Sequence, residues 1–269
     1  MSERRHILLI SGGKDSTALA LYMRDKHPER DVEYLFCDTH KELRETYDYL
    51  ARIEAFLEKP ITRLAAGHGE RGFDHFLKVF GDYLPAPSMR WCTKKMKIEP
   101  FESYVGDDPV DLYVGIRADE RREGYISTKP NIRPVFPFKE DGITKTDVFR
   151  ILDQSGVGVP EYYEWRTRSG CYFCFFQQKI EWVGLMEKHP DLFELAKGYE
   201  KPDQGFTWIQ GESLEALAQP DRVEQIKQET AKRRAAAKAR RKPRSLAEAF
   251  GAQPDDADDD AVGCLICHL

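Results

Sequence analysis

The feature that most constrains the fold of this chain lies near its start, where an apolar run is followed at once by a glycine turn and a helix-favouring stretch. Residues 7–10 are apolar, residues 11–16 read SGGKDS, and residues 17–26 favour a helix. A strand, a tight turn and a helix in this order leave the first helical N–H groups and the positive end of the helix dipole directed at the turn. The turn is therefore suited to hold a phosphate.

The side chains of the turn support this interpretation. They comprise two conformationally permissive glycines, two hydroxyl donors and one cation: Gly12, Gly13, Ser11, Ser16 and Lys14. Asp15 is unexpected beside an anion, unless it holds Mg²⁺ or orients a helix N–H. The Walker loop is excluded, because it is longer and ends in Gly-Lys-Ser/Thr. The alternative is an ordinary glycine turn that begins a helix.

Along the rest of the chain, short apolar strands alternate with longer helical patterns, which predicts a doubly wound parallel α/β sheet with helices on both faces. Strands are expected at residues 6–10, 33–37, 61–64 and 112–116. Helices are expected at residues 16–26, 42–58, 72–81, 94–104, 144–154, 175–200 and 226–241. Ligands of such sheets bind beyond the carboxyl ends of the strands. The turn, Asp38 and Gly115–Arg117 each follow an expected strand, so we expect them to meet in one crevice.

Several segments resemble motifs of known families, in the right order. The SGGKDS turn resembles the PP-loop, SGGxDS, of the ATP pyrophosphatases, which split ATP between the α and β phosphates. Further segments resemble motifs of the phosphoadenylylsulfate reductase superfamily. They are residues 38–46 (similar to DTG-x-E-x-x-ET, with His40 in place of glycine), 90–100, 113–122 (similar to GxRxxES-x-x-R, with Arg121 in place of serine), 132–149 and 170–174 (similar to GCxxC). The resemblance covers about residues 5–200. It implies the adenine nucleotide α-hydrolase-like fold.

The resemblance also implies the site residues. ATP, accompanied by Mg²⁺, would be bound by Ser11, Gly12, Gly13, Lys14, Asp15, Ser16, Asp38, Thr39, Gly115 and Arg117. Among these, Lys14, Asp15, Ser16 and Arg117 would be catalytic. Arg117 is expected to reach a phosphate bidentately with its planar guanidinium. The side chains of the loop are expected to add little to the core.

The chain has six cysteines, and with no export signal they favour metal or redox chemistry over disulfides. Cys37 ends an apolar strand and is expected to be a buried core thiol. Cys171 and Cys174 have a CxxC spacing, which suits a metal, an iron–sulfur cluster or a redox pair.

Similarity to the adenylylsulfate reductases of the same superfamily maps Cys92, Cys171 and Cys174 onto three ligands of a four-iron, four-sulfur cluster. Trp91 stands where those enzymes have a further cysteine. Either Cys264 or Cys267 completes the shell, or one iron stays open to sulfide or substrate. Zinc is the alternative metal.

The C-terminal part differs in character, which divides the chain into a PP-loop domain (1–200), a basic helical appendage (201–250) and an acidic tail (251–269). Lys227–Arg244 holds nine basic residues and one acidic residue. This run predicts electrostatic contact with nucleic acid or an acidic protein, or else is a solvated helix face. The tail ends in Cys264-x-x-Cys267-His268, which would accept a persulfide from a cysteine desulfurase or another donor, or would have no specific role.

Taken together, these segments favour an ATP pyrophosphatase that forms AMP and pyrophosphate to activate a substrate for sulfur transfer. The pattern is most similar to the ATP pyrophosphatase subunit of bacterial DNA phosphorothioation systems. The alternatives are a phosphoadenylylsulfate or adenylylsulfate reductase, a tRNA-thiolating PP-loop enzyme and a non-catalytic nucleotide-binding defence subunit. The intact loop favours ATP, because the reductases receive an activated sulfonucleotide and commonly have a degenerate loop. No apolar run approaches the roughly 18 residues of a membrane helix, so a cytoplasmic protein without membrane contact is expected.

Overall fold

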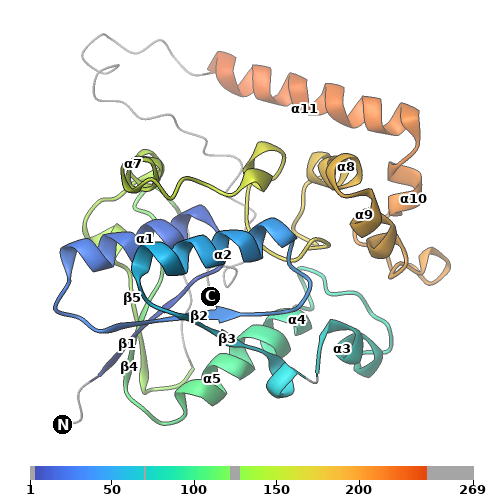
Figure 1. Cartoon of the computed structure of the whole chain (residues 1–269). Helices are drawn as coiled ribbons and strands as arrows, with labels where there is room; N and C mark the ends of the chain where they lie inside the picture. The colour runs from blue at the N-terminus through green and yellow to red at the C-terminus, as the bar shows by residue number, and fades with distance from the viewer. Residues whose placement is uncertain (1–3, 70, 122–127, 241–269) are drawn as a thin grey trace.

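A five-stranded, wholly parallel sheet forms the centre of the molecule, with the strand order β3-β2-β1-β4-β5 (Figure 1). The computed structural model describes residues 4–69, 71–121 and 128–240. The strands are β1 (Arg5–Leu9), β2 (Val32–Cys37), β3 (Ile61–Leu64), β4 (Val110–Tyr113) and β5 (Ile132–Val135). The predicted parallel α/β fold is confirmed.

Helices cover both faces of this sheet. One face carries α1 (Lys14–Lys26), α2 (Arg44–Leu57) and α7 (Lys145–Ser155) (Figure 1). The other carries α5 (Glu99–Val105), which continues from α4 (Trp91–Thr93) through the π-helical turn η2 (Lys94–Ile98). The remaining elements are η1 (Ala66–Gly69), α3 (Phe73–Val79), α6 (Pro137–Glu140), η3 (Glu161–Glu164), α8 (Lys179–Lys188), α9 (Pro190–Lys197), η4 (Pro202–Gln204), α10 (Leu214–Leu217) and α11 (Pro220–Arg240).

Alternation along the strands sends neighbouring side chains into two separate cores. Leu8 of β1 packs with the helices α1, α2 and α7, whereas Ile7 and Leu9 pack on the opposite side with Phe101 of α5. All three β1 side chains are almost completely buried. This explains why the strands appear in the sequence as continuous apolar runs rather than alternating ones, as is typical of parallel sheets covered on both faces.

A third hydrophobic cluster lies beside the sheet and joins distant segments of the chain. It includes Phe73 of α3, Trp91 of α4, Trp182 of α8 and Ile226 of α11. The expected helical stretch 175–200 is two helices, because Pro190 lacks an N–H and begins a new helix. Its expected apolar anchors are confirmed: Trp182, Leu185 and Phe193 are buried, and Met186 and Leu192 pack against the cluster.

Two sheet elements differ from the expectation. β5 was not expected, since its four residues include Pro134; the strand lies at the sheet edge, where proline is tolerated. β4 ends at Tyr113 rather than at residue 116, because the Ile116 amide turns back to the Val114 carbonyl at 2.9 Å.

The structure describes only part of the C-terminal region for which the sequence makes predictions. The tail 251–269, with Cys264 and Cys267, lies outside the described residues, as do residues 241–244 of the basic run. Within the described part of the chain, no helix combines the length and apolar character that crossing a bilayer requires.

Candidate functional site

The carboxyl edge of the sheet gathers the predicted ATP-binding segments. β1 lies between β2 and β4, so the loop after β1, Asp38 after β2 and Gly115–Arg117 after β4 meet there, as expected. Gly115 lies so close to the first turn of α1 that a Cβ atom at this position would be 3.2 Å from the Asp15 carbonyl oxygen. The absence of a side chain at Gly115 therefore lets the β4 segment contact the start of α1.

The loop itself has the tight geometry that its glycines predict. Gly12 has a φ of 72°, and an added Cβ would lie 2.7 Å from Thr46 Cγ2. Gly13 caps α1 in an extended conformation. The Ser11 amide donates to Ser16 Oγ at 3.1 Å, and the two hydroxyl oxygens are also 3.1 Å apart. The two serines therefore close the loop on itself.

A buried charge network surrounds Asp15. One carboxylate oxygen is 2.9 Å from Lys14 Nζ and the other is 2.8 Å from Arg117 Nη1. The same guanidinium contacts Glu120 Oε1 at 2.9 Å and Asp119 Oδ1 at 3.0 Å. The side chains of Lys14, Asp15, Arg117 and Glu120 are all at most 5% exposed. The loop side chains are thus buried, the expectation that they add little to the core stays a prediction, and the Arg117 fork meets carboxylates in this structure.

A segment far away in sequence covers the loop. The Tyr162 hydroxyl donates to the Gly12 carbonyl at 2.7 Å, and the Lys14 amide donates to the Tyr163 hydroxyl at 3.1 Å. Ser169 Oγ donates to Ser11 Oγ at 3.1 Å. These residues were not expected in the site. The only sequence signal was their position just before the Gly-Cys-x-x-Cys segment.

Ser169 and Tyr163 also explain why position 13 requires glycine. A Cβ atom on Gly13 would lie 2.7 Å from Ser169 Oγ and 3.2 Å from the Tyr163 hydroxyl. Because both neighbours approach from the covering segment, this glycine permits the close approach of a second chain segment as well as of a ligand.

Asp38 is held at the end of β2 by local hydrogen bonds. Asp38 Oδ1 accepts from the His40 amide and from the Tyr47 hydroxyl, both at 2.8 Å. Burial, together with Asp38, raises the pKa of Tyr47 above its usual range. His40 has a φ of 56°, which is the left-handed region. That conformation accounts for the glycine that the resembled motif has at this position.

Thr39 connects the end of β2 to the Cys-x-x-Cys segment. Its hydroxyl donates to Glu42 Oε1 at 3.0 Å and lies 3.1 Å from Cys171 Sγ. Burial raises the pKa of Glu42, although Lys97 counters this in part. Burial also raises the pKa of the Cys171 thiol, with a further contribution from Glu42. The Cys171 thiol therefore lies at the same sheet edge as the predicted ATP site.

A buried arginine fixes the chain around Cys171. Arg166 donates from Nη1 to the Gly170 carbonyl at 2.9 Å and from Nη2 to the Cys171 carbonyl at 2.7 Å. Cys174 is close enough to affect the pKa of Cys171. The Cys-x-x-Cys loop is thus ordered through its backbone.

The three predicted cluster ligands lie in one region of the fold. Cys92 and Cys171 both pack against the third hydrophobic cluster, and the Arg90 guanidinium lies 5.0 Å above the ring of Phe176. Thiolates are the donor type that an iron–sulfur cluster or zinc requires. Within residues 4–69, 71–121 and 128–240, however, no three His, Cys, Asp or Glu side chains are arranged as a metal site. The chemistry of the donors fits a cluster, whereas the arrangement of these side chains is not that of a formed ligand shell.

Cys37 has the role expected from the sequence. Its side chain is buried at the end of β2 and packs in the core that faces α5. Burial raises the pKa of its thiol to about 12. It is therefore a core thiol.

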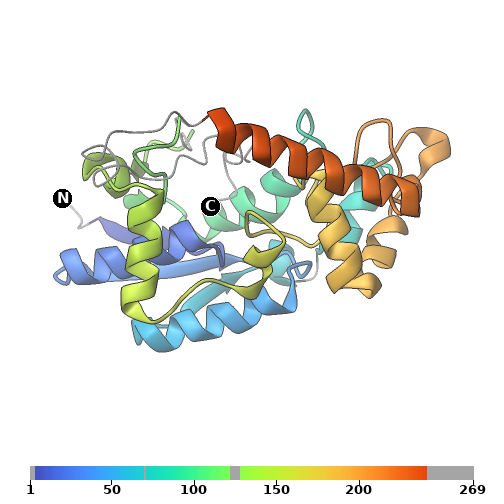
Figure 2. The same ribbon diagram turned by 90° about the horizontal axis from the view of Figure 1, so that it is seen from above.

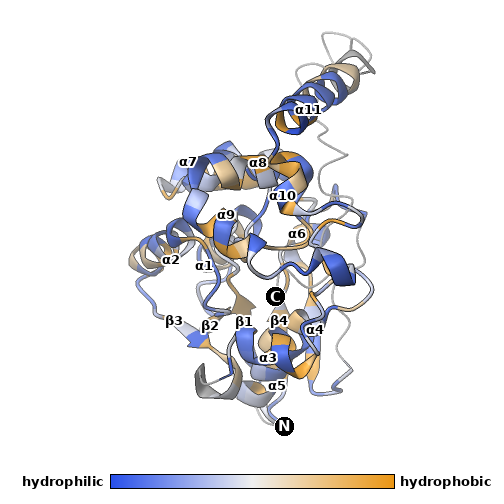
Figure 3. Ribbon diagram, turned by 90° about the vertical axis from the view of Figure 1, so that its right-hand side faces the viewer, coloured by the Kyte–Doolittle hydropathy of each residue, from blue (hydrophilic) through white to orange (hydrophobic). Residues whose placement is uncertain are grey.

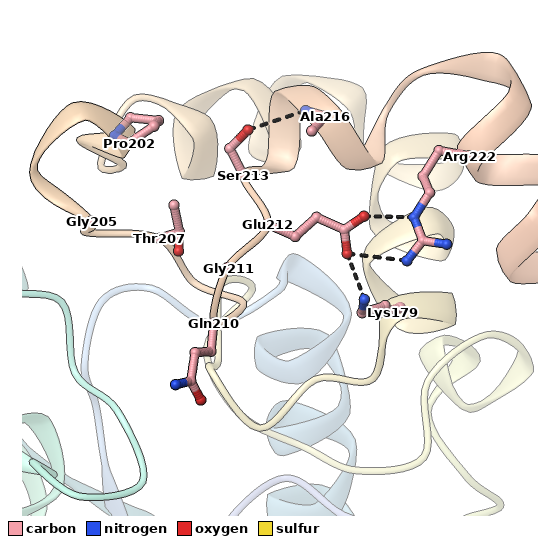
Figure 4. Close-up of a pocket in the computed structure, with 10 residues that line it drawn as sticks. All are labelled: Lys179, Pro202, Gly205, Thr207, Gln210, Gly211, Glu212, Ser213, Ala216 and Arg222. Carbon is pink, nitrogen blue, oxygen red and sulfur yellow. Dashed lines mark hydrogen bonds and ion pairs between the residues drawn. The ribbon is translucent and has the colours of Figure 1, made fainter.

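A separate cavity of about 640 Å³ lies in the C-terminal region (Figure 4). Lys179 of α8, Arg222 of α11 and the loop around Glu212 line it. The predicted ATP-binding residues and cysteines are not among its lining residues. This cavity is therefore distinct from the site at the sheet edge.

Comparisons with known proteins agree with the fold. The family model described as "Phosphoadenosine phosphosulfate reductase domain" matches residues 5–175, which contain the loop, Asp38, Arg117 and the Cys-x-x-Cys segment. Among solved structures, the phosphate complex of phosphoadenylyl-sulfate reductase from Candida auris matches with a TM-score of 0.50 and 17% identity, over 63% of this chain and 82% of that one.

Two curated relatives come from Methanocaldococcus jannaschii. The uncharacterized protein MJ0973 is 28% identical over 68% of this chain, and the uncharacterized protein MJ0066 is 28% identical over 76% of it. The chain spans 44% of the length of each of these relatives.

Proposed function

Because the chain belongs to the phosphoadenosine phosphosulfate reductase domain family, we propose that it is a PP-loop ATP pyrophosphatase that activates a substrate for sulfur transfer. The observation that carries this proposal is the loop of residues 11–16 at a helix N-terminus, with the cations of Lys14 and Arg117 both within 3 Å of Asp15. Helix amides, hydroxyls and two adjacent cations together suit a polyphosphate.

In the proposed reaction a substrate oxygen attacks the α phosphorus of ATP. The new O–P bond forms as the bond between the α phosphorus and the bridging oxygen breaks, and pyrophosphate leaves with that electron pair. A sulfur nucleophile then displaces AMP from the activated substrate. Lys14 and Arg117 would stabilise the charge on the leaving pyrophosphate, and the loop amides and Ser16 would orient it.

The structure limits how Mg²⁺ would be held. Each carboxylate oxygen of Asp15 is already paired with a cation, Lys14 or Arg117. Mg²⁺ is commonly bound through substrate phosphates and waters with one or two carboxylates. We therefore expect the nucleotide phosphates to supply most of its ligands here.

The sulfur part of the proposal rests on the cysteines. Cys92, Cys171 and Cys174 would hold a four-iron, four-sulfur cluster, which when bound would supply sulfide or electrons at the sheet edge. A cysteine desulfurase or another sulfur donor would provide the sulfur, and DNA, as in phosphorothioation systems, is the proposed acceptor. Anaerobic purification followed by iron, zinc and visible-absorption measurements tests this. Serine variants at the three positions should lose iron and colour, whereas Cys37→Ser should keep both; full zinc occupancy without iron would contradict the cluster.

The second candidate is a sulfonucleotide reductase, which the matching family model favours. One experiment separates the two functions: AMP and pyrophosphate are quantified from ATP, and sulfite from adenylylsulfate and its 3′-phosphorylated form. The proposal expects turnover of ATP, reduced by about 100-fold or more in Ser16→Ala because a phosphate-site donor is lost. Ser155→Ala, the same change at the C-terminal end of α7, is the matched control. Sulfite release without ATP turnover would establish the reductase instead.

A further inference from the structure

Helix α11 has two halves with different surroundings, and the first half is firmly anchored. Glu212 accepts from Arg222 Nε at 2.6 Å and pairs with Lys179 Nζ at 2.6 Å, which ties the start of α11 to α8 (Figure 4). Ile226 is 2% exposed in the third hydrophobic cluster, and Lys227 pairs with Glu187 of α8 at 2.6 Å. The direction of the helix is therefore fixed by the body of the protein.

The second half of the helix comprises residues 231–240, which we call the basic half. Residues 231–236 are all exposed, and Figure 3 shows α11 extending outward with mostly hydrophilic colouring. Viewed from above, the helix runs across the top of the molecule from its attachment near α10 (Figure 2). In sequence the basic half has five basic residues and no acidic residue, while the chain as a whole carries a net charge of -5.

The cations at the centre of the basic half have no carboxylate partner within the part of the chain that the structure describes. Neither Lys232 nor Arg234 pairs with a carboxylate among the described residues, and Arg233 contacts the side-chain oxygen of Gln178 at 2.7 Å. Lys232 and Arg234 also lie more than one turn before the helix end at Arg240. Interaction with the helix dipole, which falls off within the last turn, therefore does not account for them.

We propose that the basic half of α11 docks on duplex DNA through the phosphate backbone. Ten helical residues span about 15 Å. An α-helix fits the major groove of B-form DNA, which is about 12 Å wide. The major groove of A-form RNA is deep and narrow and does not admit a helix in this way. Groove shape therefore favours DNA over duplex RNA.

The interaction has a defined physical character. Lysine and arginine contacts to phosphate release counterions, so affinity falls steeply with salt and carries no sequence preference. The alanines between the cations, such as Ala235 and Ala236, are small enough to let the helix approach the groove closely. This surface is separate from the PP-loop site. The inference deepens the proposed function, in which DNA is the acceptor, but it is argued from the helix alone.

The test uses the full chain and a fluorescently labelled 20-base-pair duplex, with binding followed by anisotropy from about 50 to 200 mM salt. The double variant Lys232→Gln and Arg234→Gln removes two cations while keeping good helix formers. The matched control is Lys78→Gln and Lys188→Gln, which removes two exposed cations from α3 and α8. Circular dichroism checks that both proteins keep their helix content.

We expect the basic-half variant to bind duplex DNA at least 10-fold more weakly and the control to stay within twofold. The slope of log K against log salt should become shallower by about 1.8, because each lost phosphate contact contributes about 0.9. Absence of duplex binding by the unmodified chain at low salt, equal binding by the two variants, or tighter binding of duplex RNA than of DNA would each overturn the inference. Failure of the ATP assay leaves these outcomes unaffected, so the two proposals fail separately.

Discussion

Replacement of Asp15 by asparagine tests whether the charge network at the PP-loop stabilises the fold. Asp15 is 2.9 Å from Lys14 Nζ and 2.8 Å from Arg117 Nη1, and its side chain is 4% exposed. At an effective dielectric constant of about 20, each contact corresponds to about 6 kcal/mol of Coulomb attraction, much of which the burial of the charges offsets. Removal of one partner of a buried pair destabilises proteins by about 3–5 kcal/mol. We expect Asp15→Asn to lower the free energy of unfolding by about 4 kcal/mol.

A matched control exists on the surface of the same protein. Asp108 pairs with Arg5 Nη1 at 2.8 Å, the distance found between Asp15 and Arg117, but the Asp108 side chain is 60% exposed. Exposed pairs contribute about 0–1 kcal/mol, so Asp108→Asn should change stability by less than 1 kcal/mol. Urea unfolding followed by far-ultraviolet circular dichroism, without nucleotide, measures both variants. If Asp15→Asn unfolds no earlier than Asp108→Asn, the network contributes nothing to the fold and this argument is refuted.

Three further predictions concern other parts of the structure. Gly12→Ala should destabilise the protein by at least 1 kcal/mol more than Gly205→Ala in thermal unfolding, since both glycines have a positive φ, near 72° and 77°, but only Gly12 has a neighbour within 3 Å of an added Cβ. Cys37 should resist iodoacetamide in the native protein up to about pH 10, as mass spectrometry of the alkylated cysteines would show, because a pKa of about 12 leaves its thiol protonated. Arg222 lowers the pKa of Glu212, so this carboxylate should stabilise the start of α11 at neutral pH and lose that effect as the pH falls through its lowered pKa; Glu212→Gln should speed hydrogen exchange there at pH 7, and the difference from the unmodified chain should shrink as the pH is lowered.

The part of the site that the sequence predicts is the part encoded locally. Residues 7–26 hold the apolar run, the glycines and the helix signal next to one another in the chain. The alternation of strands and helices predicts a parallel sheet, and in such a sheet Asp38 and Arg117 lie at the same carboxyl edge. Even a departure from the resembled motif was informative: His40 stands where glycine is usual, and the structure gives it a positive φ. Local conformation and the meeting of these segments at one sheet edge were therefore predictable from the sequence.

The parts that were missed depend on contacts between distant segments. Tyr162 and Ser169 contact the loop although they lie about 150 residues further along the chain. The hydrophobic pattern of the residues around them does not predict such a contact. The sequence also identified Asp15 and Arg117 as site residues without showing that they pair with each other. β5 was not predicted, because a strand of four residues that contains Pro134 has too short an apolar pattern to indicate a strand.

The charges of the network bear on the role of an aspartate in the proposed phosphate site. Among the described residues, Asp15 pairs with the cations of Lys14 and Arg117, and Arg117 also pairs with Asp119 and Glu120. In the proposed ATP site, binding would transfer at least one of these cations from a carboxylate to a phosphate. Until then the carboxylates keep both cations buried and oriented, which is the preorganisation that electrostatic catalysis requires. The exchange favours a ligand with several charges over a monoanion, because only a highly charged ligand compensates for the broken pair.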